Sequence, residues 1–175
     1  MNILLAKQGI AALLFTILLG GAVILNKARF PGVLGGPTAD LVMTSTGSSV
    51  DFSMNTSKVK DTQIDGIQIV AKISADSERT YTFTPESIAG LQPLLTTVEK
   101  ENDIYTLRVV YLSDPPDRPF TITSDQLALG KFSVNDTDGG TIVIEPNQTL
   151  TKSIIHGKDR SILKVGKPFS FSPTQ

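Results

Sequence analysis

The sequence predicts an all-β protein, an antiparallel β-sandwich of about nine strands that follows one N-terminal transmembrane helix. Three observations lead to this prediction. They are an uncharged apolar run near the N-terminus, apolar residues at every second position from Leu41 onward, and Gly, Pro, Asn and Asp between these alternating runs. Strict alternation places the apolar side chains on one face of a sheet and the polar ones toward water.

Composition excludes several classes of protein. The chain has 175 residues, a formal net charge of −1, no cysteine and a single histidine, His156. A chain so close to neutrality lacks the clustered basic face that neutralises phosphates, so we expect no nucleic-acid partner. Without cysteine there is no disulfide, no Cys-bound zinc and no thiol catalysis. One histidine excludes a multi-histidine metal site.

The N-terminal segment, residues 1–28, is predicted to be a membrane anchor. The run Gly9–Leu25 is uncharged and largely apolar, and Lys7 and Lys27 bound it. As a helix it would cover about 25 Å, which snorkelling lysines can extend toward the roughly 30 Å of a hydrocarbon core. A buried core helix would show a polar stripe, which this run lacks. The alternative is a signal segment cut at Gly20–Ala22, which would leave a secreted protein.

Positive charges flank the apolar run on both sides, so they do not determine its orientation. We place the C-terminal domain outside the cell because a short N-terminal span followed by a sandwich is the usual export layout. The start of the chain also resembles a type IV pilin at the Gly9–Ile10 junction, where a glycine precedes a long apolar helix. Pilins carry a glutamate at the fifth position after that cut, and this chain has Leu14 there.

A linker is predicted over residues 29–38, and the domain over residues 39–175. The stretch Arg29–Asp40 holds two prolines and three glycines. Proline fixes φ and glycine loosens it, so neither a helix nor a strand should persist there.

Alternation predicts the strands of the domain one after another. They centre on Leu41–Met43, Val50–Met54, Ile67–Ile73, Tyr81–Phe83, Tyr105–Tyr111, Leu127–Val134, Ile142–Ile144 and Phe169–Phe171. Within the sixth of these, the apolar positions predict an irregularity at Gly130. One short helical turn is expected at Glu86–Ala89, before Pro93 interrupts it.

The order of these motifs resembles cohesin-like domains between Ala39 and Phe171. The stretches that carry the resemblance are ADLVMTST, FSMNTS, IDGIQIVAKIS, LALGKFSVNDTDGGTIVIEP, TKSIIHGKDRSIL and KPFSFS. Cohesin domains are jelly-roll sandwiches related in shape to some carbohydrate-binding modules, and they hold dockerin modules through one sheet face. The resemblance implies a non-catalytic binding module displayed outside the cell, with a dockerin-like or surface protein as its partner.

The acidic, glycine-rich segment Asn135–Gly140 is the first candidate for a ligand site. An EF-hand loop needs oxygen ligands at positions one, three and five before its glycine. With Gly139 as that glycine, Asp136 and Asp138 fit, but position one falls on Val134. An Asp-Gly pair between alternating strands is typical of a hairpin turn. The sequence therefore predicts a hairpin here, with Ca²⁺ binding as the alternative.

Two other groups of residues are candidates for binding. Asp114 and Asp117 flank two prolines after a strand end, where a rigid loop could present both carboxylates to a cation or to sugar hydroxyls. A stiff connector is the competing interpretation. Tyr105 and Tyr111 share one strand face and could stack on a polysaccharide if they are exposed. The competing interpretation is packing in the core or across strands.

Catalytic residues are not evident in the sequence. His156 lies near Ser153 and Asp159, but proximity in sequence is not the geometry of a triad, and no glycine-framed nucleophile accompanies it. We therefore predict a protein that is not an enzyme and has no cofactor. The leading hypothesis is a single-pass, membrane-anchored module for protein attachment or assembly at the cell surface. The alternatives are a cell-surface carbohydrate-binding module and a pilin-like structural subunit.

Overall fold

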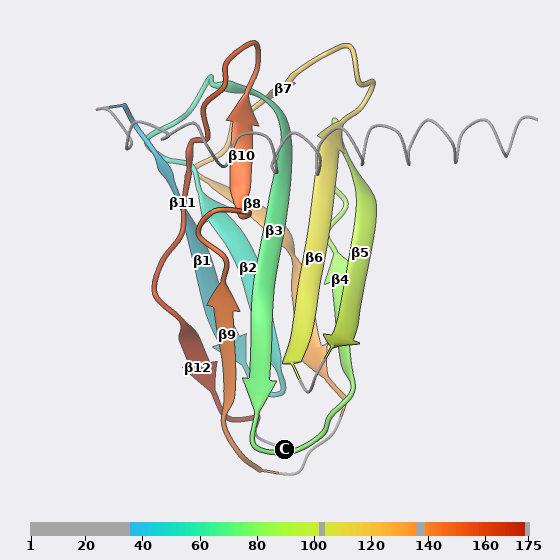
Figure 1. Cartoon of the computed structure of the whole chain (residues 1–175). Coiled ribbons are helices and arrows are strands. Elements are labelled where there is room, and N and C mark those ends of the chain that lie inside the picture. Colours follow the sequence, from blue (N-terminus) through green and yellow to red (C-terminus); the bar gives the residue numbers. More distant parts are fainter. Residues whose placement is uncertain (1–35, 102–103, 136–138, 174–175) are drawn as a thin grey trace, which may run out of the picture. The chain divides into compact units, whose positions relative to one another are not determined.

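The structure is a computed structural model that describes residues 36–101, 104–135 and 139–173 (Figure 1). These residues form twelve β-strands and no helix. The predicted all-β class is thus confirmed, with more strands than the nine or so expected. The predicted anchor Gly9–Leu25 lies outside the described residues, and the division into anchor, linker and domain stays a prediction. No described segment is a helix of the length and apolarity needed to cross a membrane.

The first sheet contains five strands in the order β11-β1-β2-β8-β4. Their bounds are Leu163–Lys164 for β11, Ala39–Thr46 for β1, Ser49–Asn55 for β2, Gln126–Val134 for β8 and Tyr81–Pro85 for β4. β1 and β11 pair in parallel, and the other neighbours pair antiparallel.

The second sheet contains seven strands, five of them in the order β12-β9-β3-β6-β5. Their bounds are Phe169–Phe171 for β12, Ile142–Pro146 for β9, Gln63–Ala75 for β3, Ile104–Ser113 for β6 and Leu91–Glu101 for β5. The remaining two, β7 (Phe120–Thr121) and β10 (Lys152–Ile155), also pair with β3. In Figure 1 this sheet faces the viewer, with β3, β6 and β5 side by side.

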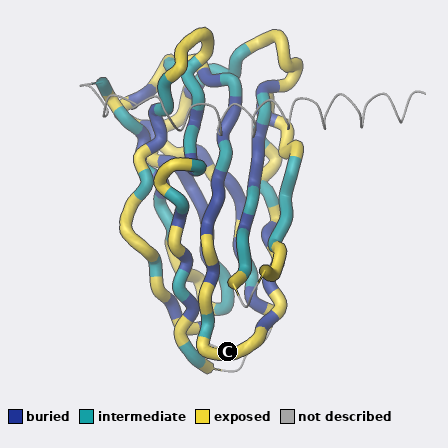
Figure 2. Tube along the Cα trace, in the orientation of Figure 1, coloured by how far each residue is buried: buried dark blue, intermediate teal, exposed yellow. Residues whose placement is uncertain are grey.

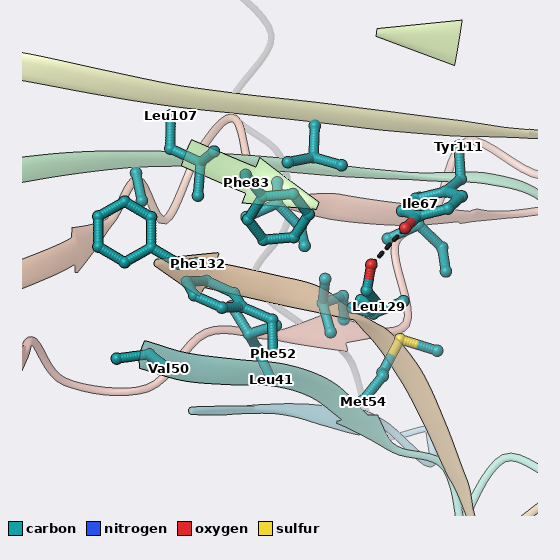
Figure 3. Packing of buried hydrophobic residues seen from close by; sticks show 14 of the residues in the cluster. Leu41, Val50, Phe52, Met54, Ile67, Phe83, Leu107, Tyr111, Leu129 and Phe132 are labelled. Atoms are coloured by element: carbon teal, nitrogen blue, oxygen red, sulfur yellow. Dashed lines mark hydrogen bonds between the residues drawn. The ribbon is translucent and has the colours of Figure 1, made fainter. Parts of the chain in front are cut away.

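The alternating apolar residues of both sheets meet in one core (Figure 3). Phe52 and Phe132 from the first sheet and Leu107 and Tyr111 from the second are at most 1 % exposed. Phe83 meets Phe52 edge-on, with ring centroids 5.5 Å apart. The period-two pattern therefore arises because two layers of strands enclose their apolar faces between them.

The irregularity predicted at Gly130 is confirmed. β2 and β8 shift register between Phe52 and Ser53, opposite Gly130. Gly130 has a φ of 143°, and a Cβ atom there would lie 2.5 Å from the carbonyl oxygen of Thr84. Only glycine allows this backbone conformation and this close approach without strain.

The helical turn predicted at Glu86–Ala89 is wrong. Residues Glu86–Ala89 form no helix, and Ile88 makes an isolated bridge with Leu91. The residues after Gly90 form the long strand β5, and Pro93 lies within it. Among the described strands β5 pairs only with β6, so it is an edge strand, and its register shifts between Pro93 and Leu95. An edge strand tolerates proline because one side of its backbone needs no hydrogen-bond partner, and the bulge blunts the edge further.

The hairpin predicted at Asn135–Gly140 is also wrong. β8 before it belongs to the first sheet and β9 after it to the second, so the segment crosses between sheets. The described ends of this connection are held by the loop between β3 and β4. Arg79 donates from Nη2 to the carbonyl of Gly139 at 3.0 Å, and the amide of Asn135 donates to Thr80. Asp136 and Asp138 lie outside the described residues.

Candidate functional site

The outward face of the second sheet carries an unusual set of side chains. In β3 and β6, Ile69, Ala71, Leu107 and Val109 point into the core. The alternate positions therefore point outward. We call six of these outward residues the outer patch: Val70 from β3, Arg108, Val110 and Leu112 from β6, and Leu95 and Thr97 from β5.

Strand register makes the outer patch continuous. Val70 lies opposite Arg108 across the β3–β6 pair. On the other side of β6, Leu95 lies opposite Val110, and Thr97 lies opposite Arg108. Directly opposed side chains on one face of a sheet are in contact distance of one another. The patch thus runs across three strands without interruption.

The outer patch is apolar for an uncovered sheet face. Val70 and Val110 are only 6 % and 8 % exposed although neither belongs to the core cluster. Leu95 and Leu112 are half-buried. Figure 2 shows that β3 and β6 are buried or half-buried along much of their length. Leu94, at the bulge of β5 beside the patch, is 48 % exposed. Among the described residues no third layer packs on this face (Figure 1).

Two polar atoms within the outer patch lack partners. Thr97 Oγ1 and Arg108 Nε are buried and form no hydrogen bond with any residue that the structure describes. A buried polar group without a partner costs about 1–3 kcal/mol. Such groups are rare in native proteins, and each one calls for an explanation, among which a functional role is one.

A loop borders the outer patch beside β3. β9 and β10 both pair with the same side of β3, and residues 147–151 loop out between them. Thr151 fills the resulting gap in the ladder, because its hydroxyl accepts from the amide of Val70 at 3.1 Å and donates to the Val70 carbonyl at 2.8 Å. A polar hollow of about 310 Å³ adjoins this loop and is lined by Lys72 and Glu145 among others.

The two candidate tyrosines do not form an exposed pair. Tyr111 is 0 % exposed, and burial raises the pKa of its hydroxyl to about 12. Tyr105 is half-buried and meets Tyr81 edge-on, with centroids 4.7 Å apart. A platform for sugar stacking needs two accessible ring faces, so the competing interpretation, packing in and against the core, describes these residues.

The candidate carboxylates Asp114 and Asp117 lie in an exposed loop after β6. The amide of Asp114 donates to the carbonyl of Gly90, and the amide of Arg118 donates to the carbonyl of Pro115, which closes a turn. Within the described part of the chain, no three His, Asp or Glu residues gather as metal ligands would. Ca²⁺ binding stays a prediction.

The residues considered for a triad make other contacts. His156 Nδ1 lies 2.6 Å from Asp65 Oδ1. Ser153 is fully buried and donates from Oγ to the carbonyl of Gly66 at 3.2 Å. Both contacts hold the β10 segment against β3, which is a structural role.

The sequence contained a signal for part of the outer patch. Val70 and Val110 occupy the positions that alternation assigns to water, and apolar residues there indicate a face that avoids water. Leu95 and Thr97 were missed because no strand was predicted over Leu91–Glu101, where the residues do not alternate between apolar and polar. The pairing of Thr97 with Arg108 depends on the register of β5 against β6, which no local pattern reveals.

No family model matches the chain, and no curated protein matches it. Several solved structures are similar in fold. CaCohA2 from Clostridium acetobutylicum is 15 % identical over 81 % of this chain and 94 % of its own, with a TM-score of 0.46. The third cohesin of ScaC from Acetivibrio cellulolyticus, solved in complex with the ScaB dockerin, is 16 % identical over 79 % and 99 %, with a TM-score of 0.46. A cohesin module from Clostridium perfringens is 10 % identical over 79 % and 96 %, with a TM-score of 0.40.

These similarities agree with the cohesin-like β-sandwich that the sequence predicted. At such identities and TM-scores the likeness concerns the arrangement of strands and says nothing of what this chain binds. What this chain binds must therefore be inferred from the outer patch itself.

Proposed function

We propose that this protein is a non-catalytic binding module, anchored in the cell membrane with its domain outside the cell, and that its outer patch holds a partner protein. The observation that supports binding is the outer patch: four apolar side chains and two unpartnered polar atoms on a sheet face that no described element covers. The apolar run Gly9–Leu25 supports the anchor.

A protein partner suits this face better than a small molecule. The patch is spread over three strands of a sheet, whereas sites for small ligands are concave pockets. Protein interfaces combine an apolar centre with polar groups that become paired on binding. The side chains of Val70, Leu95, Val110 and Leu112 would supply the centre, and Thr97 and Arg108 the polar groups.

Binding can be tested with the full chain and a panel of purified dockerin modules, the partners present in several of the similar cohesin structures. Leu95→Asp should weaken binding about 10-fold or more, because it removes a half-buried apolar side chain and adds a charge beside Val110 in the patch. Val42→Asp is the matched control. Val42 is half-buried and lies on the outward face of the first sheet, because its neighbours Leu41 and Met43 point toward the core. A partner that binds both variants as tightly as the wild type would show that the outer patch is not the site.

The anchor is tested separately by the mass of the mature N-terminus. A retained anchor leaves the chain intact through residue 28 and in the membrane fraction. Cleavage near Gly20–Ala22 would make the protein secreted, and cleavage after Gly9 would favour the pilin-like subunit.

A further inference from the structure

We propose that the outer patch recognises an acidic segment of its partner, and that Arg108 is the residue that selects the partner's carboxylate. This proposal rests on the proposed function, because it specifies which kind of protein segment the patch accepts. The positively charged Arg108 is the only charged residue of the six in the patch.

Arg108 has no counter-ion of its own. None of the ion pairs or side-chain hydrogen bonds between described residues involves its guanidinium group. Glu99 is the acid that strand register brings nearest, since it lies opposite Thr106, one outward position along β6 from Arg108. Glu99 is exposed and forms no ion pair with Arg108.

A buried side-chain nitrogen distinguishes Arg108 from the charges around it, among which Lys152 of β10 is half-buried but has no buried atom without a partner. Lys72, Glu99 and Glu145 border the patch on neighbouring strands and are exposed, so water solvates them and they need no partner. Arg108 is half-buried, and its Nε is fully buried without an acceptor. A partly desolvated cation gains more from an arriving anion than a solvated one does, because screening by water is weaker there.

The geometry of the site favours a carboxylate as that anion. A guanidinium group presents a planar fork of N–H donors, and a carboxylate can accept two of them together. Thr97 lies directly across from Arg108, and its buried hydroxyl forms no hydrogen bond with the guanidinium group, which therefore keeps its donors for the anion. The apolar residues next to this pair, Leu95 and Val110, would take an apolar side chain that neighbours the acid in the partner.

The complementary charge also sets specificity. A basic segment would place a like charge against Arg108, and a purely apolar segment would bury the guanidinium without a partner. Both cost free energy that an acidic segment does not. The patch thus discriminates among partners that could otherwise satisfy its apolar residues.

The experiment is a selection of random dodecapeptides, displayed on phage, against the full chain and three variants. Arg108→Gln removes the charge, Arg118→Gln removes an exposed arginine in the loop after β6 as the matched control, and Leu95→Asp disrupts the apolar part of the patch. Arg108→Lys keeps the positive charge but lacks the planar pair of guanidinium N–H donors. It replaces Arg108→Gln in the experiment if Arg108→Gln does not fold. Each variant is first compared with the wild type by urea unfolding.

We expect clones selected on the wild type and on Arg118→Gln to be enriched in Asp and Glu, and clones selected on Arg108→Gln to lack that enrichment. An acidic clone should bind Arg108→Gln about 10-fold more weakly or worse, as the loss of a charged hydrogen-bonded pair predicts. Equal affinity for the wild type and Arg108→Gln, with binding lost in Leu95→Asp, would overturn the role of Arg108 and leave the proposed function standing. If the selected clones bind Leu95→Asp as tightly as the wild type, or if no clones are selected at all, both the role of Arg108 and binding by the outer patch would be overturned.

Discussion

Tyr111 connects the two sheets through its hydroxyl group. The residue belongs to β6 of the second sheet, and its hydroxyl donates to the carbonyl of Leu129 in β8 of the first sheet (Figure 3). The same oxygen accepts from the amide of Glu86, just after β4, at 3.0 Å. Tyr111→Phe keeps the ring and removes both hydrogen bonds of the hydroxyl, whereas the amide of Glu86 still donates to the carbonyl of Leu129 at 3.1 Å. We therefore expect a loss of about 0.5–1.5 kcal/mol in the free energy of unfolding, measured in urea. Tyr105→Phe is the control, because no described residue bonds to the Tyr105 hydroxyl.

The burial of this hydroxyl also predicts the response to alkaline pH. Burial raises the pKa of Tyr111 to about 12 from the ordinary value of 10.0, and it raises the pKa of Tyr81 too. The folded state therefore favours the neutral phenols. Their contribution to stability is full below pH 10 and is lost as the pH rises toward about 12. Between pH 10 and about 12, the free energy of unfolding measured in urea should fall as the pH rises. The fall should be smaller in Tyr111→Phe. An unchanged slope would contradict the prediction.

Gly130 shows how a residue can be predicted from sequence and explained by structure. The break in alternation between Leu129 and Phe132 predicted an irregularity, and the reason for glycine there is the nearby Thr84 carbonyl. Gly130→Ala should destabilise the fold by about 2–5 kcal/mol through strain and overpacking. Gly166→Ala, where the added Cβ meets nothing within 4 Å, should change the urea midpoint little. Similar midpoints for the two variants would refute this account.

At the scale of elements, the Thr151 hydroxyl joins the loop between β9 and β10 to β3. Thr151 is 2 % exposed and bonds to both backbone groups of Val70, whose carbonyl also accepts from the amide of Asn147 at 2.7 Å. Thr151→Val has nearly the same shape but leaves the Val70 amide unpaired, so we expect a loss of about 1–3 kcal/mol in the free energy of unfolding. Thr149→Val, in the same loop but exposed, should leave stability unchanged. Equal effects would show that the hydroxyl of Thr151 is dispensable.

Strands β5 and β9 show where local patterns mislead. In the sequence, Pro93 indicates only the interruption of a helical turn, yet it lies within β5, which has a neighbour on one side only among the described strands. The Asp-Gly pair before β9 is typical of a hairpin, yet β8 and β9 join different sheets. Both errors have one cause. Whether a strand is an edge strand, and which sheet it joins, depends on residues far away in the sequence.

At the scale of the whole molecule, the described strands enclose one continuous core. Neither sheet can keep its apolar face out of water without the other, so the domain should unfold in one step. Far-UV circular dichroism reports the strands, and near-UV circular dichroism reports the tyrosines, since the chain has no tryptophan. The two urea transitions of the full chain should coincide. Earlier loss of the tyrosine signal would indicate that the sheets separate before they unfold.

The sequence by itself determined the fold class, the inward face of most strands and the irregularity at Gly130, because side-chain alternation is a local consequence of extended backbone. It also marked Val70 and Val110 as apolar residues on a face assigned to water. Only the tertiary structure decided that β5 is a strand, that the Asn135–Gly140 segment crosses between sheets, and that Thr97 lies against Arg108. The physical reason is that period two specifies which way a side chain points, whereas the neighbour it meets is chosen by pairing between strands distant in sequence.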